Sequence, residues 1–448
     1  MTDFEDLEPL LSANTRSYVG TTAFADDRLD RKALAEKLTG YLERLNDGAV
    51  LAIDAPWGEG KTWFGRNWNK YLNDEGYKTI YIDAFEQDYI EDPFMLLASE
   101  LLAVVEEKSK AKTQLAKKSV DVLKATMSIG TKIGAGLATK YLLGDVELGE
   151  EVEKAISDAS GETALLTSKL IEENFAQYEE NKHTIDAYKN ELTKYASTQK
   201  KPLVIFIDEL DRCKPDFAVN IIERIKHFFD VPNIVFVLLL NRDQLEKAVK
   251  GVYGSETDAG AYLGKFVHFF FALPKPNQSG DNSELILKQF IESTMKKYKF
   301  SREAENDSFV SYMRFWAHRF NLSLRDIEKA VALYSFAYPA GPLSYILTYL
   351  IVLKLKQPTL FSKLLIGDIE AHKKAKLTIE KFLEDKNIQE RSNDQYILSY
   401  YLEWHEAYIN GFTKLGEHFG AELQGAWPVD KRNLFKMLAK KIELDIER

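Results

Sequence analysis

The sequence predicts an α/β fold built around a parallel β-sheet. Five short apolar segments are separated by stretches rich in helix-forming residues. Strands that are apolar throughout are typical of a parallel sheet that helices cover on both faces. Three of the five segments stop at a polar residue, namely Asp54, Asp208 or Asn241. Because ligands of such sheets bind beyond the carboxyl ends of the strands, we expect the functional chemistry at that edge.

Helices are predicted between most of these strands. One helix is expected over 27–46, beginning at acidic residues, and another over 62–72, directly after the first strand. A third is expected over 217–229, and the chain from 283 to 448 has a helical pattern almost throughout. The predicted strands cover residues 49–53, 79–82, 203–207, 234–240 and 267–272.

The composition excludes several classes of protein. The chain has 448 residues, of which 45% are hydrophobic and 29% charged, so it is neither a disordered nor a collagen-like chain. Its one cysteine, Cys213, allows no intrachain disulfide and favours a reducing compartment. The net charge of −10 argues against a protein that coats nucleic acid non-specifically.

The sequence gives no sign of a signal peptide or a membrane span. The N-terminus is acidic and lacks a basic n-region, and no apolar run reaches the roughly 18 residues that cross a bilayer. The two nearest candidates, 127–143 and 343–355, carry lysines and are predicted to be buried or interfacial helices. We therefore expect a cytoplasmic protein.

The distribution of proline indicates the domain organisation. None of the 12 prolines lies between Pro93 and Pro202, and that stretch is rich in Ala, Leu, Lys and Glu. A polar, proline-containing segment follows the fifth strand and suits a linker. The predicted domains are 1–99 and 200–275 for a divided core, 100–199 for a helical insertion, and 276–448 for a helical C-terminal domain.

The loop after the first strand matches the phosphate-binding pattern G-x-x-x-x-G-K-[ST], with Ala55 in place of the first glycine. In such a loop, backbone N–H groups surround phosphate oxygens and the following helix adds its positive N-terminal end. Lys61 is expected to reach the β- and γ-phosphates, and the Thr62 hydroxyl to bind Mg²⁺. The predicted nucleotide-binding residues are Ala55, Pro56, Trp57, Gly58, Glu59, Gly60, Lys61, Thr62 and Trp63.

The third strand ends in an acidic pair that suits a nucleoside triphosphatase. Asp208 would hold Mg²⁺ through its water shell, and Glu209 would orient or deprotonate the attacking water. The alternative is a helix N-terminus that favours acidic residues. The phosphate loop upstream favours the first interpretation, because the two motifs together are more specific than either alone.

Four further polar residues are candidates with two interpretations each. Asn241 would lie between the γ-phosphate and the attacking water, or it would cap the next helix. Arg212 and Arg242 would stabilise charge in the transition state, or they would form surface salt bridges. Arg325, at the start of an amphipathic helix, would reach the γ-phosphate, or it would be an ordinary exposed arginine.

These motifs resemble those of the KAP family of P-loop NTPases. The similarity lies in residues 55–62, Ala-Pro-Trp-Gly-Glu-Gly-Lys-Thr, and in residues 206–215, Phe-Ile-Asp-Glu-Leu-Asp-Arg-Cys-Lys-Pro. Residues 81–94 and 262–274 are similar to the segments after the family's second strand and around its fifth. The resemblance covers roughly residues 20–340.

The resemblance implies an ATPase with sheet order 5-1-4-3-2, a helical insertion between strands two and three, and a helical domain after the fifth strand. It implies that Lys61 and Thr62 bind phosphate and Mg²⁺, that Asp208 is the metal-side carboxylate and that Glu209 is the base. Many bacterial members are linked to defence against phage and act beside a partner protein. Many relatives carry transmembrane helices in the insertion, which this sequence lacks, and their fourth strand often ends in Asp where Asn241 stands here.

Three hypotheses about function follow. In the first, ATP hydrolysis at the interface of a homo-oligomer switches the conformation of the insertion and the C-terminal domain, with a partner effector encoded nearby. In the second, the protein is a scaffold that binds ATP with negligible turnover. In the third, it is an ATPase that acts on DNA, which the net charge disfavours.

Overall fold

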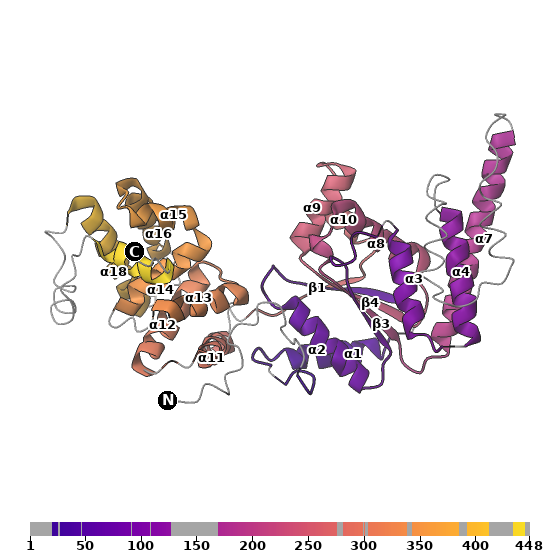
Figure 1. The fold of residues 1–448 in the computed structure, drawn as a ribbon, viewed down its shortest axis with the longest axis horizontal. Helices are drawn as coiled ribbons and strands as arrows, with labels where there is room; N and C mark the ends of the chain where they lie inside the picture. Colours follow the sequence, from indigo (N-terminus) through magenta and orange to yellow (C-terminus); the bar gives the residue numbers. More distant parts are fainter. Residues whose placement is uncertain are drawn as a thin grey trace, which may run out of the picture. The chain divides into compact units, whose positions relative to one another are not determined.

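The computed structural model describes residues 20–25, 27–45, 47–90, 92–107, 109–126, 169–275, 281–298, 300, 303–337, 343–384, 392–411 and 433–443. The chain forms two compact units (Figure 1). Among the described residues, the sheet unit lies within 17–57 and 61–273, and the helical unit lies within 274–448 and includes the short loop segment 58–60.

The sheet unit contains a five-stranded parallel sheet in the order β2-β3-β4-β1-β5. This is the predicted order 5-1-4-3-2 read from the other edge, so the predicted fold class is confirmed. The strands are β1 (Ala49–Asp54), β2 (Thr79–Asp83), β3 (Leu203–Asp208), β4 (Ile234–Leu240) and β5 (Phe269–Ala272).

The central strands are covered on both faces, as predicted. Every residue of β3 and β4 is buried, as is every residue of β1 before Asp54. The edge strand β5 is half-buried or exposed along its length, and it begins at Phe269, two residues later than predicted. Directly before β5, the His268 N–H donates to the Val50 carbonyl oxygen, and the His268 Nδ1 accepts from the Val50 N–H, both at 2.9 Å. A ring nitrogen thus takes the place that a main-chain carbonyl would occupy in the ladder.

Two helical layers cover the sheet, as Figure 1 shows. On one face, α1 (Arg31–Leu42) and α2 (Lys61–Asp74) pack on alternate strand residues such as Leu51 and Phe206. On the other face, α3 (Pro93–Val104), α8 (Pro215–Phe228) and α9 (Arg242–Tyr253) pack on the residues between them. This period of two follows from the pleat of the strands.

The first helix begins at Arg31 rather than at 27. The Asp27 carboxylate accepts hydrogen bonds from the backbone N–H of Leu29, in the turn before the helix, and from that of Lys32, the second helical residue. Asp30, directly before the helix, has a left-handed backbone (φ 52°) and makes no side-chain cap. The acidic start of the predicted helix is therefore a turn, which sequence pattern alone does not distinguish from a cap.

The described residues between β2 and β3 form helices and turns. The helices are α3, α4 (Lys110–Thr126) and α7 (Lys169–Ser197), and α4 and α7 lie side by side (Figure 1). The apolar run 127–143, with its glycines at 130, 134 and 136, lies outside the described residues. The described residues of this unit also include the single turn of 3₁₀-helix at Leu210–Arg212 and the short helix α10 (Ala259–Leu263).

The helical unit is built around α14 (Ser344–Lys356), whose first ten residues are all buried. This explains the apolar run that the sequence shows there. Among the residues that the structure describes, no helix is long and apolar enough to cross a membrane. The surrounding helices are α11 (Asp281–Lys296), α12 (Glu303–Arg319), α13 (Leu324–Ala337), α15 (Pro358–Leu365), α16 (Ile369–Leu383), α18 (Ser392–Asn410) and α20 (Leu434–Glu443).

Two fully buried histidines join α16 to α18 in this core. The Nδ1 atoms of His372 and His405 lie 2.9 Å apart, and the His405 Nε2 lies 3.0 Å from the Tyr349 hydroxyl. One ring must donate and the other accept across the Nδ1 pair, so the contact requires the accepting ring to be neutral and is lost when both rings are protonated. Burial lowers the pKa of His372 to about 4 and the pKa of His405 well below its usual value.

The protein should therefore lose stability on mild acidification. Unfolded histidines bind protons below about pH 6.5, whereas the folded pair stays neutral down to about pH 4. Stability should be complete above pH 6.5 and fall below it, by up to about 1.4 kcal/mol per pH unit for each proton that only the unfolded chain binds. Thermal unfolding at pH 7.5 and 5.0 checks this. His372→Phe should weaken the pH dependence, and an unchanged dependence would contradict the explanation.

Candidate functional site

The candidate site lies at the carboxyl edge of the sheet, where β1 and β3 end in Asp54 and Asp208. The phosphate-binding loop follows β1 and leads into α2, which begins at Lys61. Gly58 and Gly60 have φ angles of 85° and 77°, a region that residues with a Cβ rarely adopt. The loop conformation therefore depends on these two glycines.

The side chain of Lys61 folds back over the loop and is buried. Its Nζ donates to the carbonyl oxygen of Ala55 at 2.7 Å and lies 3.5 Å from that of Pro56. Burial lowers the pKa of Lys61, while the carboxylates of Asp211 and Asp208 oppose the shift. An ammonium held by two carbonyl oxygens can exchange these neutral partners for phosphate oxygens, which bind a cation more strongly.

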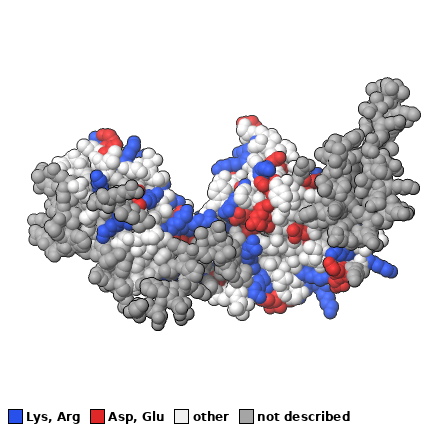
Figure 2. All heavy atoms as spheres, in the orientation of Figure 1, with Lys and Arg blue, Asp and Glu red and all other residues white. Residues whose placement is uncertain are grey.

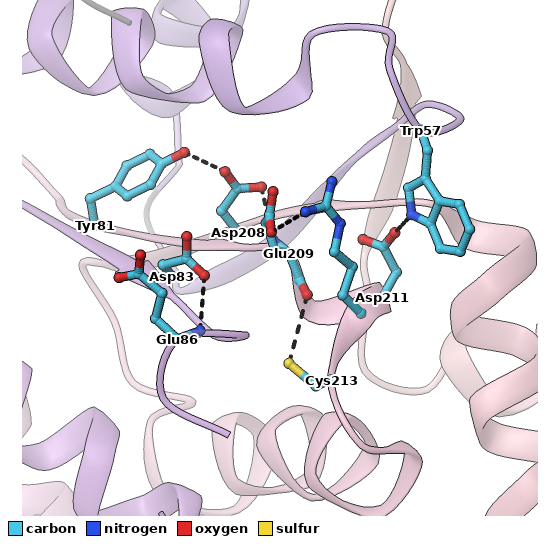
Figure 3. Close-up of polar contacts among 9 residues, drawn as sticks. Trp57, Tyr81, Asp83, Glu86, Asp208, Glu209, Asp211 and Cys213 are labelled. Carbon is cyan, nitrogen blue, oxygen red and sulfur yellow. Dashed lines mark hydrogen bonds and ion pairs between the residues drawn. The ribbon is translucent and has the colours of Figure 1, made fainter. Parts of the chain in front are cut away.

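Asp208 is fully buried at the end of β3, and its carboxylate accepts one hydrogen bond on each oxygen. Oδ2 accepts from the Tyr81 hydroxyl and Oδ1 from the Glu209 N–H, both at 2.8 Å (Figure 3). Burial raises the pKa of Asp208, and these hydrogen bonds and an interaction with the Thr62 side chain oppose the rise.

Thr62 and Asp208 are suitable ligands for Mg²⁺. They bring a hydroxyl and a carboxylate close to one another, and Mg²⁺ prefers oxygen ligands. A hydroxyl that donates its proton to the carboxylate still presents a lone pair to a metal. A cation beside Asp208 would also compensate for the cost of burying its charge.

Glu209 directly follows β3 and has a left-handed backbone (φ 59°). Residues other than glycine adopt this region at some cost and often at functional sites. Its Oε2 lies 2.6 Å from Nη1 of Arg212, three residues further along. Burial raises the pKa of Glu209, and the charge of Arg212 opposes this rise. The structure thus shows Arg212 as an ion-pair partner of the predicted base.

The end of β4 separates the two interpretations of Asn241. Asn241 stands at the N-cap position of α9, but its side chain makes no capping hydrogen bond. The carboxylate of Asp54, at the end of the neighbouring β1, instead accepts from the N–H of Arg242 at 2.9 Å. Arg242 itself pairs with Glu246 at 2.8 Å. The side chain of Arg242 therefore matches the salt-bridge interpretation. The side chain of Asn241 does not cap the helix.

Asp54→Ala should destabilise the protein by about 0.5–2 kcal/mol, the usual cost of losing a helix cap. Asn241→Ala should cost less stability, because no cap is lost, and should lower nucleotide turnover if Asn241 contacts the γ-phosphate. Thermal unfolding and phosphate release, measured on both variants, test the pair. A larger loss of stability for Asn241→Ala than for Asp54→Ala would contradict this assignment.

Three further residues of the predicted site, Trp57, Trp63 and Arg325, lie in different surroundings. Trp57 is 46% exposed and donates from its indole nitrogen to Asp211 (Figure 3). Trp63 packs edge-on against Phe24, with ring centroids 5.6 Å apart, in the core cluster that α1 and α2 form with the sheet. Arg325 is the second residue of α13 in the helical unit, and its role remains a prediction.

Sequence reasoning missed two residues of this edge, Tyr81 and Asp83 on β2. Asp83 stands in register with Asp208 on the neighbouring strand, and its charge raises the pKa of Asp208 and Glu209. The sequence contained a signal for Asp83, because the second apolar segment also ends at an aspartate. The role of Tyr81 had no signal in the sequence, since it depends on the pairing of β2 with β3.

On the face drawn in Figure 2, the acidic and basic side chains of the described residues are interspersed. The described part of this face thus presents mixed charge rather than one broad area of positive charge. A protein that binds nucleic acid mainly through phosphate contacts has a basic patch or stripe.

Three comparisons place the chain among known proteins. A family model described as "KAP family P-loop domain" matches residues 31–339. A comparison with curated protein sequences found no significant match. Among solved structures, the chain is similar to the ORC2 protein of Aeropyrum pernix in its ADPNP-ADP complexes, with 12% identity over 96% of this chain and 97% of that chain. The TM-score is 0.36, and a similarity of this size carries no argument about function.

Proposed function

Because the chain belongs to the KAP family of P-loop NTPases, we propose that it is a Mg²⁺-dependent ATPase. One observation carries the proposal: the indole nitrogen of Trp57, in the phosphate-binding loop, donates a hydrogen bond to Asp211, in the acidic motif. The phosphate-binding and the acidic motifs are therefore adjacent in space, although they lie far apart in the sequence.

Each residue has a distinct task in the proposed reaction. Lys61 and the backbone N–H groups of the loop bind the phosphates. Thr62 and Asp208 hold Mg²⁺, which when bound neutralises charge on the β- and γ-phosphates. Glu209 accepts a proton from the attacking water through Oε1, the oxygen that its contact with Arg212 leaves available.

The experiment is phosphate release by the purified protein with ATP, GTP, CTP or UTP, each with Mg²⁺ and with EDTA. We expect release from ATP that requires Mg²⁺ and that exceeds release from the other three nucleotides. Preference for another nucleotide would correct the substrate, and release that EDTA does not affect would contradict the role of Mg²⁺.

A scaffold that binds ATP with negligible turnover is a second candidate, and the contact between Glu209 and Arg212 favours it. Burial raises the pKa of Glu209, but the charge of the Arg212 guanidinium at 2.6 Å opposes this rise, which makes Glu209 a weaker base than the same buried carboxylate without this partner. The same assay distinguishes the candidates, because tight binding of ATP without phosphate release supports the scaffold. If Arg212 restrains Glu209, then Arg212→Ala should raise the release.

The family resemblance supports further parts of the proposal. We propose that hydrolysis switches the conformation of the insertion and the helical unit in a cytoplasmic homo-oligomer. We also propose a role in bacterial defence against phage, together with an effector encoded nearby. Sedimentation with and without Mg²⁺-ATP tests the oligomer, and phage infection of cells that carry wild type or Lys61→Ala tests the defence role. Salt-dependent DNA binding would support a DNA-acting ATPase instead.

A further inference from the structure

Tyr81 contacts the predicted metal-side carboxylate from a strand that carries neither nucleotide motif. Its hydroxyl donates to Oδ2 of Asp208 at 2.8 Å, as the dashed line in Figure 3 shows. The Glu209 N–H occupies Oδ1 at the same distance. Both oxygens of the carboxylate are thus held, and each keeps one lone pair for a further partner.

The ring of Tyr81 is fixed by its own neighbours. It stacks on Phe206, its register partner on β3, with centroids 5.8 Å apart and an interplanar angle of 20°. The guanidinium of Arg66, on α2, lies 4.5 Å from the ring centroid on the face of the ring. These contacts involve the ring alone, so they fix the direction in which the hydroxyl points.

Gly65 of α2 has no side chain, and the Tyr81 hydroxyl lies close to the position that a Cβ would take. A Cβ at this position would lie 3.2 Å from the Tyr81 hydroxyl and 2.1 Å from Cδ1 of Leu239. The helix that carries Lys61 and Thr62 therefore passes close to Tyr81 one turn later. The hydroxyl lies between that helix and the end of β3, where the phosphate-binding and acidic motifs meet.

We propose that Tyr81 positions Asp208 for the Mg²⁺-nucleotide complex. This inference rests on the proposed function. Groups that orient a metal-binding carboxylate fix which lone pairs face the metal or its water, and their loss typically weakens metal binding about 10- to 100-fold. Tyr81 touches neither nucleotide nor metal in this proposal, so it acts through Asp208 as a positioning residue.

The test measures metal binding, without turnover. Mn²⁺ is titrated into protein with a non-hydrolysable ATP analogue, and free Mn²⁺ is read by electron paramagnetic resonance. In Tyr81→Phe, which keeps the ring and its stacking, the apparent affinity for Mn²⁺ should fall about 10-fold or more. Its affinity for the analogue in EDTA should equal that of the wild type.

Tyr77→Phe is the matched control. Tyr77 lies four residues before Tyr81, and its hydroxyl also donates to a carboxylate, that of Glu43 at 3.2 Å. The variant removes this hydroxyl and keeps the ring. It should leave both affinities unchanged. A second arm uses Asp208→Asn, in which adding Tyr81→Phe should weaken Mn²⁺ binding much less than it does in the wild type.

Each other outcome overturns a defined claim. If the wild type takes up no Mn²⁺ with the analogue, both the proposed function and this inference fail. If the wild type does so and Tyr81→Phe matches it, the inference alone fails. Equal losses of Mn²⁺ binding and of metal-free nucleotide binding in Tyr81→Phe would also overturn it, because Tyr81 would then support the packing of the site.

Discussion

Glu209→Gln should bind Mg²⁺-ATP as tightly as the wild type and release phosphate about 10²- to 10⁴-fold more slowly, the usual contribution of a general base. The amide keeps the size of the side chain but cannot take a proton from water. It also replaces the ion pair with Arg212 by a weaker hydrogen bond from the guanidinium to a neutral amide oxygen. Equilibrium binding of a fluorescent ATP analogue and steady-state phosphate release measure the two properties separately.

A matched control for this variant is Glu246→Gln. Glu246 is also paired with an arginine in its own helical turn, Arg242 at 2.8 Å, and it is more exposed than Glu209. This control should keep the full rate of hydrolysis. Equal phosphate release from the wild type and Glu209→Gln would contradict the role of Glu209 as base.

Lys61→Ala should weaken the binding of ATP about 10- to 100-fold and abolish turnover. Charge-assisted hydrogen bonds are worth about 1.5–3 kcal/mol, and each 1.4 kcal/mol corresponds to a factor of ten in affinity. The fold should persist, because in this structure Lys61 donates only to loop carbonyl oxygens, Ala55 foremost. The measurements are nucleotide titration and thermal unfolding without nucleotide.

Lys70→Ala serves as the control for Lys61→Ala. Lys70 lies on the same helix, and its partner is Asp74 at 3.0 Å. An exposed pair of this kind contributes little to stability, so binding and turnover should be unchanged. Unaltered ATP affinity in Lys61→Ala would show that the loop does not hold phosphate in the way proposed.

The sequence was sufficient to predict the strands and the two nucleotide motifs. The buried strands β3 and β4 are apolar throughout, so their bounds match the predicted runs to within a residue. Lys61, Thr62 and Asp208 were predicted to meet from their motifs alone. Strand order came from the family resemblance, since nothing in the local pattern of an apolar strand specifies its neighbour.

Other features depend on contacts between segments that are distant in the sequence. Tyr81 meets Asp208 only because β2 pairs with β3 in one register, and Asp54 caps α9 only because β1 lies beside β4. The buried pair of His372 and His405 joins two helices of the helical unit. Hydrophobic periodicity places a residue on a face of its own element, but it does not identify the side chain across from it.

The most direct test of the proposed ATPase identifies the nucleotide that stays on the protein. Wild type and Glu209→Gln are incubated with Mg²⁺-ATP, separated from free nucleotide by gel filtration and analysed by chromatography. We predict ATP on Glu209→Gln and ADP, with released phosphate, for the wild type. The same proportion of ADP on both proteins, or no nucleotide on either, would contradict hydrolysis at this site.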